Sequence, residues 1–131
     1  MARYEHLPIY KAAMDLAICL DSVVGQFSRY HKYTTGQDLR NLSREILKLV
    51  IRANSARDKA ELLPELVTQC ETLKTLLFFA KEIKAIQSFK AFQQASSMEV
   101  VLCRQSEGLL KSSRKGQNRQ PPEVGGPASV P

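Results

Sequence analysis

Apolar residues recur at three- and four-residue steps along four stretches of the chain, which is the period of an amphipathic helix. The predicted helices cover residues 8–26, 35–57, 59–86 and 89–111. Pro8 suits the first turn of the first helix, where a missing N–H costs nothing. Thr34 or Thr35, Asp58 and Ser88 are suited to cap the other three. The pattern therefore predicts an all-α fold, an up-down four-helix bundle.

The last part of the chain differs in composition from the rest. Residues 112–131 are rich in Pro, Gly, Ser and polar side chains, and they contain almost nothing apolar to bury. Such a segment does not offset the conformational entropy lost on ordering, about 1–2 kcal/mol per residue. We expect one domain over residues 1–111 and a disordered tail over 112–131.

Two of the predicted helices carry more apolar surface than a single bundle needs. On the first helix, one set of apolar residues lies four apart and away from the main stripe. The helix over 59–86 is apolar around more than half its circumference, which favours neighbours on two sides. Scattered apolar residues are also common on protein surfaces. The candidates for a contact between subunits are Tyr10, Met14, Ile18, Phe79 and Ile83.

Positive charge is concentrated in one part of the chain. The 131 residues carry a formal net charge of +6, and segment 29–57 holds seven basic residues against two acidic ones. Arg40, Arg44, Lys48 and Arg52 are spaced four apart, so they form a column along one helix. Like charges at this spacing repel by a few tenths of a kcal/mol per pair. The column is therefore either a solvated helix face or a contact surface for an anionic partner.

The anionic partner that this surface would suit is nucleic acid. Contacts between basic side chains and phosphates supply affinity but carry little sequence information. Tyr30 and Tyr33, which lie among the basic residues, suit stacking on unpaired bases, although such tyrosines more often pack on their own bundle. The candidate nucleic-acid-binding residues are Arg29, His31, Lys32, Arg40, Arg44, Lys48 and Arg52.

No combination of residues in the sequence indicates catalysis, a metal or a cofactor. The only histidines are His6 and His31, and no Cys–His spacing resembles that of a zinc site. Phosphate-loop, dinucleotide-binding, zinc-protease and nucleophile-elbow motifs are absent. Cys19, Cys70 and Cys103 are predicted to be small buried hydrophobes. We expect a protein that is not an enzyme and that has no metal site and no cofactor.

The sequence also lacks the signals of secretion and of a membrane span. No apolar run approaches the roughly 18 residues that a membrane helix needs, and the start MARYEHLP has no signal-peptide apolar region. An odd number of unpaired cysteines argues against a disulfide framework. We expect a cytoplasmic protein with no membrane partner. Four acidic residues are interpreted as parts of solvated helix faces: Asp15, Asp21, Glu61 and Glu65.

Four segments together resemble a known family. They are LPIYKAAMDL (7–16), RYHKYTTGQDLR (29–40), IRAN (51–54) and CRQSEGLLKSS (103–113). The sequence resembles the accessory variability determinant (Avd) family of diversity-generating retroelements over about residues 4–113. That family belongs to a wider group of small four-helix-bundle proteins, which includes those encoded in 23S ribosomal RNA intervening sequences. Leu109 stands where an aromatic residue usually follows the late glycine of the family, which concerns local packing more than function.

The resemblance implies a function and an assembly. Avd-like proteins form a homopentameric barrel of four-helix protomers with a basic surface. They have no catalytic activity of their own, and they associate with the reverse transcriptase of the element and with RNA or DNA to support mutagenic cDNA synthesis. Two alternatives stay open. One is an oligomeric scaffold that binds a protein partner without nucleic acid, and the other is a ribosomal-RNA-linked protein of unknown role.

Overall fold

The computed structural model describes residues 7–54 and 59–119, and over these ranges every regular element is a helix. Four long helices are joined in sequence, with one short helix between the first two. Their bounds are α1 Pro8–Gly25, α2 Arg29–Lys32, α3 Thr35–Ala53, α4 Lys59–Glu82 and α5 Phe89–Arg119. The prediction of an all-α fold with four long helices is confirmed.

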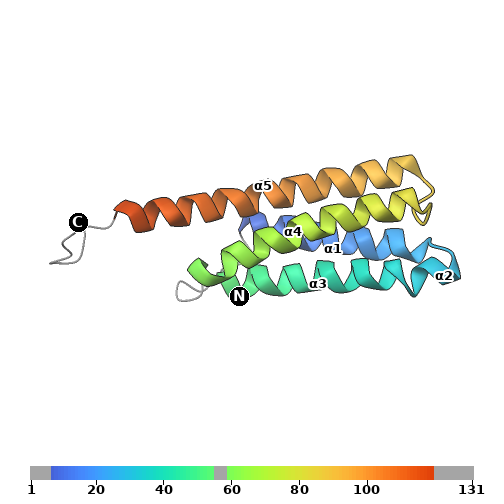
Figure 1. Cartoon of the computed structure of the whole chain (residues 1–131), viewed down its shortest axis with the longest axis horizontal. Coiled ribbons are helices and arrows are strands. Elements are labelled where there is room, and N and C mark those ends of the chain that lie inside the picture. Colours follow the sequence, from blue (N-terminus) through green and yellow to red (C-terminus); the bar gives the residue numbers. More distant parts are fainter. Residues whose placement is uncertain (1–6, 55–58, 120–131) are drawn as a thin grey trace.

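The four long helices form a closed bundle in which each packs against two others. Helix α1 packs against α3 and α5, while α4 packs against the same two helices from the opposite side. Successive long helices run in opposite directions, and α2 lies at the end of the bundle where the chain turns from α1 into α3 (Figure 1). This arrangement places α2 and α3, which carry the basic residues, on one end and one side of the bundle.

The core is built from the predicted apolar stripes. Its most completely buried side chains, each at most 1% exposed, come from all four long helices: Leu16, Leu20, Leu39, Ile46, Leu63, Leu66, Leu73, Leu77 and Leu102. Cys70 and Cys103 are buried and Cys19 is half-buried, and all three are free thiols. The prediction that the cysteines are buried is confirmed for Cys70 and Cys103.

Helix α4 ends four residues earlier than the predicted boundary at residue 86. Lys84 adopts a left-handed conformation with φ of 66°. The amide of Lys84 donates to the carbonyl of Lys81 at 3.0 Å, and that of Ala85 donates to the carbonyl of Ala80 at 2.9 Å. These two bonds close the helix in the Schellman pattern, in which glycine usually takes the left-handed position. Because a lysine occupies that position here, the residue type does not mark the end of the helix.

The end of the last helix was also predicted wrongly, in the opposite direction. Helix α5 continues to Arg119, so residues 112–119 are helical and are not part of a disordered tail. Lysine, arginine and glutamine favour helix, and no proline interrupts the chain before Pro121. Residues 120–131, the predicted helix end at 55–57 and the Asp58 cap lie outside the described residues. Pro64 lies inside α4 without ending the helix.

The predicted helix caps have different outcomes. Ser88 caps α5, because its Oγ accepts a hydrogen bond from the Ala91 amide at 3.1 Å. Thr34 occupies the cap position of α3, but its hydroxyl makes no cap bond. It donates instead to the carbonyl of Tyr30 at 2.8 Å. The cap prediction for Thr34 is wrong: its hydroxyl turns to a carbonyl of α2, which directly precedes it, and accepts no hydrogen bond from the first amides of α3.

Gly36 sets how closely the start of α3 approaches α1 and α2. A Cβ at this position would lie 2.6 Å from Val24 Cγ1, 3.0 Å from the His31 carbonyl oxygen and 3.2 Å from Phe27 Cδ2. Two of these neighbours are core side chains and the third is backbone, so they have little room to move. The absence of a side chain at Gly36 therefore allows α2 to lie against the first turn of α3.

Candidate nucleic-acid interface

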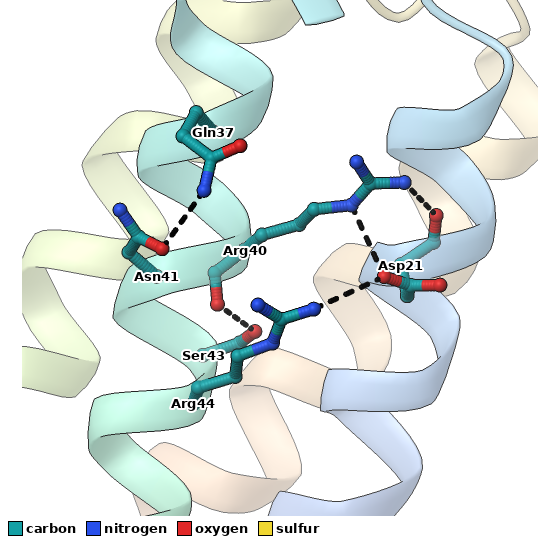
Figure 2. A network of polar contacts seen from close by, with 6 residues as sticks. All are labelled: Asp21, Gln37, Arg40, Asn41, Ser43 and Arg44. Atoms are coloured by element: carbon teal, nitrogen blue, oxygen red, sulfur yellow. Dashed lines mark hydrogen bonds and ion pairs between the residues drawn. The ribbon is translucent and has the colours of Figure 1, made fainter. Parts of the chain in front are cut away.

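The first half of the basic column ties α3 to α1. Arg40 Nε lies 3.1 Å from Asp21 Oδ1, and Arg40 Nη2 donates to the backbone carbonyl of Asp21 at 3.2 Å. Arg44 Nη2 lies 3.6 Å from the same carboxylate oxygen. Figure 2 shows both arginines reaching from α3 across to Asp21 on α1. Asp21 is thus more than part of a solvated face, since it has two partners on another helix.

The two arginines differ in how far solvent reaches them. The side chain of Arg40 is 22% exposed, whereas those of Arg44 and Asp21 are each 58% exposed. Two guanidinium groups share one carboxylate, so one positive charge of the three groups is not neutralised. Since the longer and more exposed contact belongs to Arg44, its guanidinium is the one that an anion from solvent can reach.

The second half of the column faces solvent. Lys48 Nζ lies 3.2 Å from Glu45 Oε2, one turn earlier on the same helix, and both side chains are more than half exposed. Exposed pairs of this kind contribute only about 0–1 kcal/mol, so the lysine is easily released to another anion. Arg52 is exposed and has no ion pair within residues 7–54 and 59–119.

Amide and hydroxyl groups accompany the column on α3. Gln37 Nε2 donates to Asn41 Oδ1 at 3.0 Å, and both residues are exposed. Ser43 is buried, and its Oγ donates to the Arg40 carbonyl at 3.0 Å (Figure 2). The two exposed amides are further groups that can donate to phosphate or base. They were missing from the predicted set because they carry no charge.

The predicted residues in α2 are not equally accessible. Arg29 is exposed, while His31 and Lys32 are half-buried. The Nδ1 atom of His31 is buried and has no hydrogen-bond partner in the described part of the chain. The carbonyl of His31 lies against Gly36, so the backbone at His31 is packed against α3. Arg29 is thus better placed than His31 to meet an external phosphate.

The two tyrosines that lie among the basic residues of segment 29–57 are largely exposed. Tyr30 is 73% exposed and Tyr33 is 67% exposed. The Tyr30 ring meets that of His31 edge to face, with the ring centroids 5.3 Å apart. The sequence left open whether these rings pack on their own bundle or stay free to stack on a base. Their exposure leaves them accessible to a base.

The predicted subunit-contact residues divide into two groups. Ile18 is 61% exposed and Phe79 is 49% exposed. Tyr10 and Ile83 are half-buried and pack against the core, and Met14 is also half-buried. Of these five, Ile18 and Phe79 therefore offer the larger apolar surfaces to a second molecule.

Another exposed apolar surface lies where α4 turns into α5, and the apolar pattern alone did not indicate it. Phe78 is 55% exposed and Phe89 is 62% exposed. Phe92 stands between them, with its ring centroid 6.3 Å from each of theirs. The ammonium of Lys81 lies over Phe78, 5.0 Å from its centroid. We call Phe78, Lys81, Phe89 and Phe92 the aromatic cluster. The sequence signal was a second phenylalanine beside Phe79 and another just after the Ser88 cap.

Comparisons with known proteins add no relative. The chain matches no protein-family model, no curated protein and no solved structure. The resemblance to the Avd family therefore stays a prediction. Among the helices of residues 7–54 and 59–119, none combines the length and apolar character needed to cross a membrane.

Proposed function

We propose that this protein is a non-catalytic nucleic-acid-binding protein that contacts phosphates through one side of the bundle. The observation that carries the proposal is a set of exposed cations on α2 and α3 beside two exposed tyrosines. We call Arg29, Arg44, Lys48 and Arg52 the basic face. Tyr30 and Tyr33 would stack on unpaired bases at one end of this face.

The spacing of the cations suits a flexible single strand. Arg44, Lys48 and Arg52 are successive residues at four-residue steps, which correspond to about 6 Å along a helix. Three side chains therefore cover roughly 12 Å of one helix edge with long, mobile stems. Such contacts read no base sequence, so the expected ligand class is single-stranded RNA or DNA of any sequence.

The biological role that we propose rests on the resemblance to the Avd family. In this role the protein is an accessory subunit of a diversity-generating retroelement and associates with its reverse transcriptase, its template RNA and the cDNA. The protomer would assemble into a homopentamer. The exposed side chains of Ile18 and Phe79, together with the aromatic cluster, support assembly with further subunits or with the polymerase.

A charge-removal experiment tests the nucleic-acid interface. The double variant Lys48→Gln/Arg52→Gln keeps helix propensity and most of the side-chain length. We expect weaker binding to unrelated single-stranded RNA and DNA sequences. The log–log salt dependence should become shallower by roughly 0.7 for each phosphate that is no longer bound. The measurement is a titration with labelled oligonucleotides at several salt concentrations, beside a thermal melting curve.

The matched control removes the same charge from another helix. Lys90 and Arg104 are exposed on α5, which packs against α1 and α4. The variant Lys90→Gln/Arg104→Gln should bind almost as tightly as the wild type. Equal loss in both double variants would show that only the net charge matters. Unchanged binding in Lys48→Gln/Arg52→Gln would show that the basic face is a solvated helix face.

One observation favours a second candidate function, an oligomeric scaffold that binds a protein partner without nucleic acid. The aromatic cluster exposes Phe78 and Phe89 on α4 and α5, whereas the basic column lies on α3. A scaffold would keep its assembly state when the basic face is neutralised. Light scattering at micromolar concentration measures that state. A stable monomer would contradict the homo-oligomer in both candidate functions, and a ribosomal-RNA-linked role would remain as the third.

A further inference from the structure

A carboxyl group is buried on the inner face of α5 with one atom left unpaired. Glu99 is 1% exposed and lies in the buried stripe of α5 together with Ala95 and Leu102. Its Oε2 has no hydrogen-bond partner among the described residues. Burying a carboxylate without a partner is costly, so an unpaired oxygen at this position needs a physical explanation.

A thiol and a carboxylate follow Glu99 on the next two turns of α5, and a further carboxylate faces them from α4. Cys103 is 8% exposed and stands one turn after Glu99. Its Sγ lies 3.2 Å from Glu71 Oε2 on α4 and 3.9 Å from Glu107 Oε2 on α5. One ligand atom from each of Glu71, Cys103 and Glu107 lies within 4.8 Å of the others. A thiol and two carboxylates thus converge across the α4–α5 contact.

Electrostatic interactions link Glu99 to the same group. Burial first, and then the negative charge of Glu71, raise the pKa of Glu99 to about 7, with a smaller rise from Glu107 and an opposing effect from Lys74. Burial and the hydrogen bond to Glu71 raise the pKa of Cys103 to about 12. The cluster therefore has several groups whose negative charges would repel one another here. Lys74 is the positive charge that acts on Glu99 from α4.

We propose that Glu71, Cys103 and Glu107 form a binding site for a divalent cation of the zinc type, one turn of α5 after the buried and unpaired carboxyl of Glu99. Zinc binds cysteine sulfur at about 2.3 Å and carboxylate oxygen at about 2.0–2.2 Å, in tetrahedral geometry. Those lengths put sulfur and oxygen ligands about 3.6 Å apart. The two sulfur–oxygen distances here, 3.2 and 3.9 Å, lie on either side of that value.

The donor set selects the class of metal. Calcium and magnesium prefer six or more oxygen ligands, or several waters, and gain little from a thiol. A borderline cation accepts one thiolate with carboxylates. Binding replaces the proton of the Cys103 thiol, which passes to solvent, and the positive charge of the metal offsets the repulsion among the carboxylates. The sequence predicted no metal because these ligands come from two helices at no recognisable zinc spacing.

Cobalt(II) is the probe that tests this site, because it reports a thiolate ligand by its near-ultraviolet absorption. The full chain is titrated with cobalt(II) after treatment with a chelator. We expect a thiolate band in the wild type and in Cys19→Ser, which removes a half-buried thiol on α1. Cys103→Ser should lose the band. The affinity for cobalt(II) should fall by at least about 100-fold, since loss of a group that only hydrogen-bonds to a metal ligand already lowers metal affinity by about 10- to 100-fold.

A second variant keeps the thiol and changes an exposed ligand. Glu71→Gln should weaken cobalt binding, while Glu65→Gln, an exposed change on the same helix, should not. Zinc should raise the melting temperature of the wild type and of Glu65→Gln above their values with chelator, but not that of Glu71→Gln. No thiolate band in the wild type, a band unchanged in Cys103→Ser, or an affinity for cobalt unchanged in Glu71→Gln would overturn the proposal.

Discussion

The α1–α3 side and the α4–α5 side of the bundle hold their charges in opposite ways. On the first side, Arg40 and Arg44 share the carboxylate of Asp21 at the surface, and that carboxylate is 58% exposed. On the second side, Glu99 is 1% exposed and one of its oxygens has no hydrogen-bond partner in the described residues. The carboxylate of Asp21 on the first side has both ion-pair partners and contact with water, whereas Glu99 Oε2 on the second side has neither.

The difference shows which charged groups can bind an external ligand, and whether that ligand is an anion or a cation. An exposed ion pair contributes little to stability, so its members can be exchanged for the phosphate of a ligand. A buried carboxyl loses the solvation of its ionised form, so it either keeps its proton or receives a positive ligand. Charge on α3 therefore suits reversible contact with a polyanion, and charge between α4 and α5 suits a bound cation.

The largest expected effect comes from removing the buried charge. The pKa of Glu99 rises from its ordinary value of 4.5 to about 7 in the folded protein. The folded state then binds more protons than the unfolded state between these values, so stability falls as pH rises from about 4.5 to above 7. Glu99→Gln should abolish this loss, which is at most about 3 kcal/mol.

Urea unfolding of both proteins at pH 4, 6 and 8, with chelator present, measures this difference. The two proteins should have similar stability at pH 4, where the carboxyl is largely protonated in both states. At pH 8 the free energy of unfolding of Glu99→Gln should exceed that of the wild type. The charged groups that shift the pKa of Glu99, namely Glu71, Lys74 and Glu107, are the same in both proteins. A difference in the free energy of unfolding that is the same at all three pH values would mean that the pKa of Glu99 is not raised in the folded protein.

The second effect concerns the close packing of α2 and the start of α3 at Gly36. Gly36→Ala should destabilise the protein by about 1–3 kcal/mol, because its methyl group would press on Val24 and on the His31 carbonyl. Gly108→Ala is the matched control, since a Cβ there meets nothing within 4 Å. It should stabilise α5 by about 0.5–1 kcal/mol through helix propensity. Thermal melting curves measure both effects. Stability changes of the same sign in the two variants would refute the prediction.

The smallest effect on stability sharpens the contrast between the two sides. Asp21→Asn removes the carboxylate that Arg40 and Arg44 share, at a cost of about 0–1 kcal/mol. It should tighten single-strand binding and steepen the log–log salt dependence by about 0.7 for each additional phosphate that the freed arginines bind. Asp15→Asn makes the same charge change in the exposed pair with Lys11 and should leave the salt dependence nearly unchanged. Identical salt slopes in the two variants would argue that Arg40 and Arg44 stay fixed on α1.

Local interactions determined the parts of this protein that could be predicted from its sequence. Apolar periodicity placed the four long helices and their buried leucines, because helix geometry repeats within four residues along one segment. Ser88 was recognisable as the cap of α5 for the same reason, since its bond reaches only three residues ahead. The exposed position of Arg52 followed from its place beside the apolar stripe of α3.

Only the tertiary structure decided which groups on different helices meet. Asp21 and Arg40 are 19 residues apart in sequence, and Glu71 and Cys103 are 32 apart. Whether such pairs touch depends on the rotation and the lengthwise position of each helix against its neighbour, which arise from the packing of both surfaces together. Periodicity could therefore indicate which face Arg40 and Glu99 occupy. Only the packed helices show that Arg40 contacts Asp21. They also show that Glu99 Oε2 has no hydrogen-bond partner among the described residues.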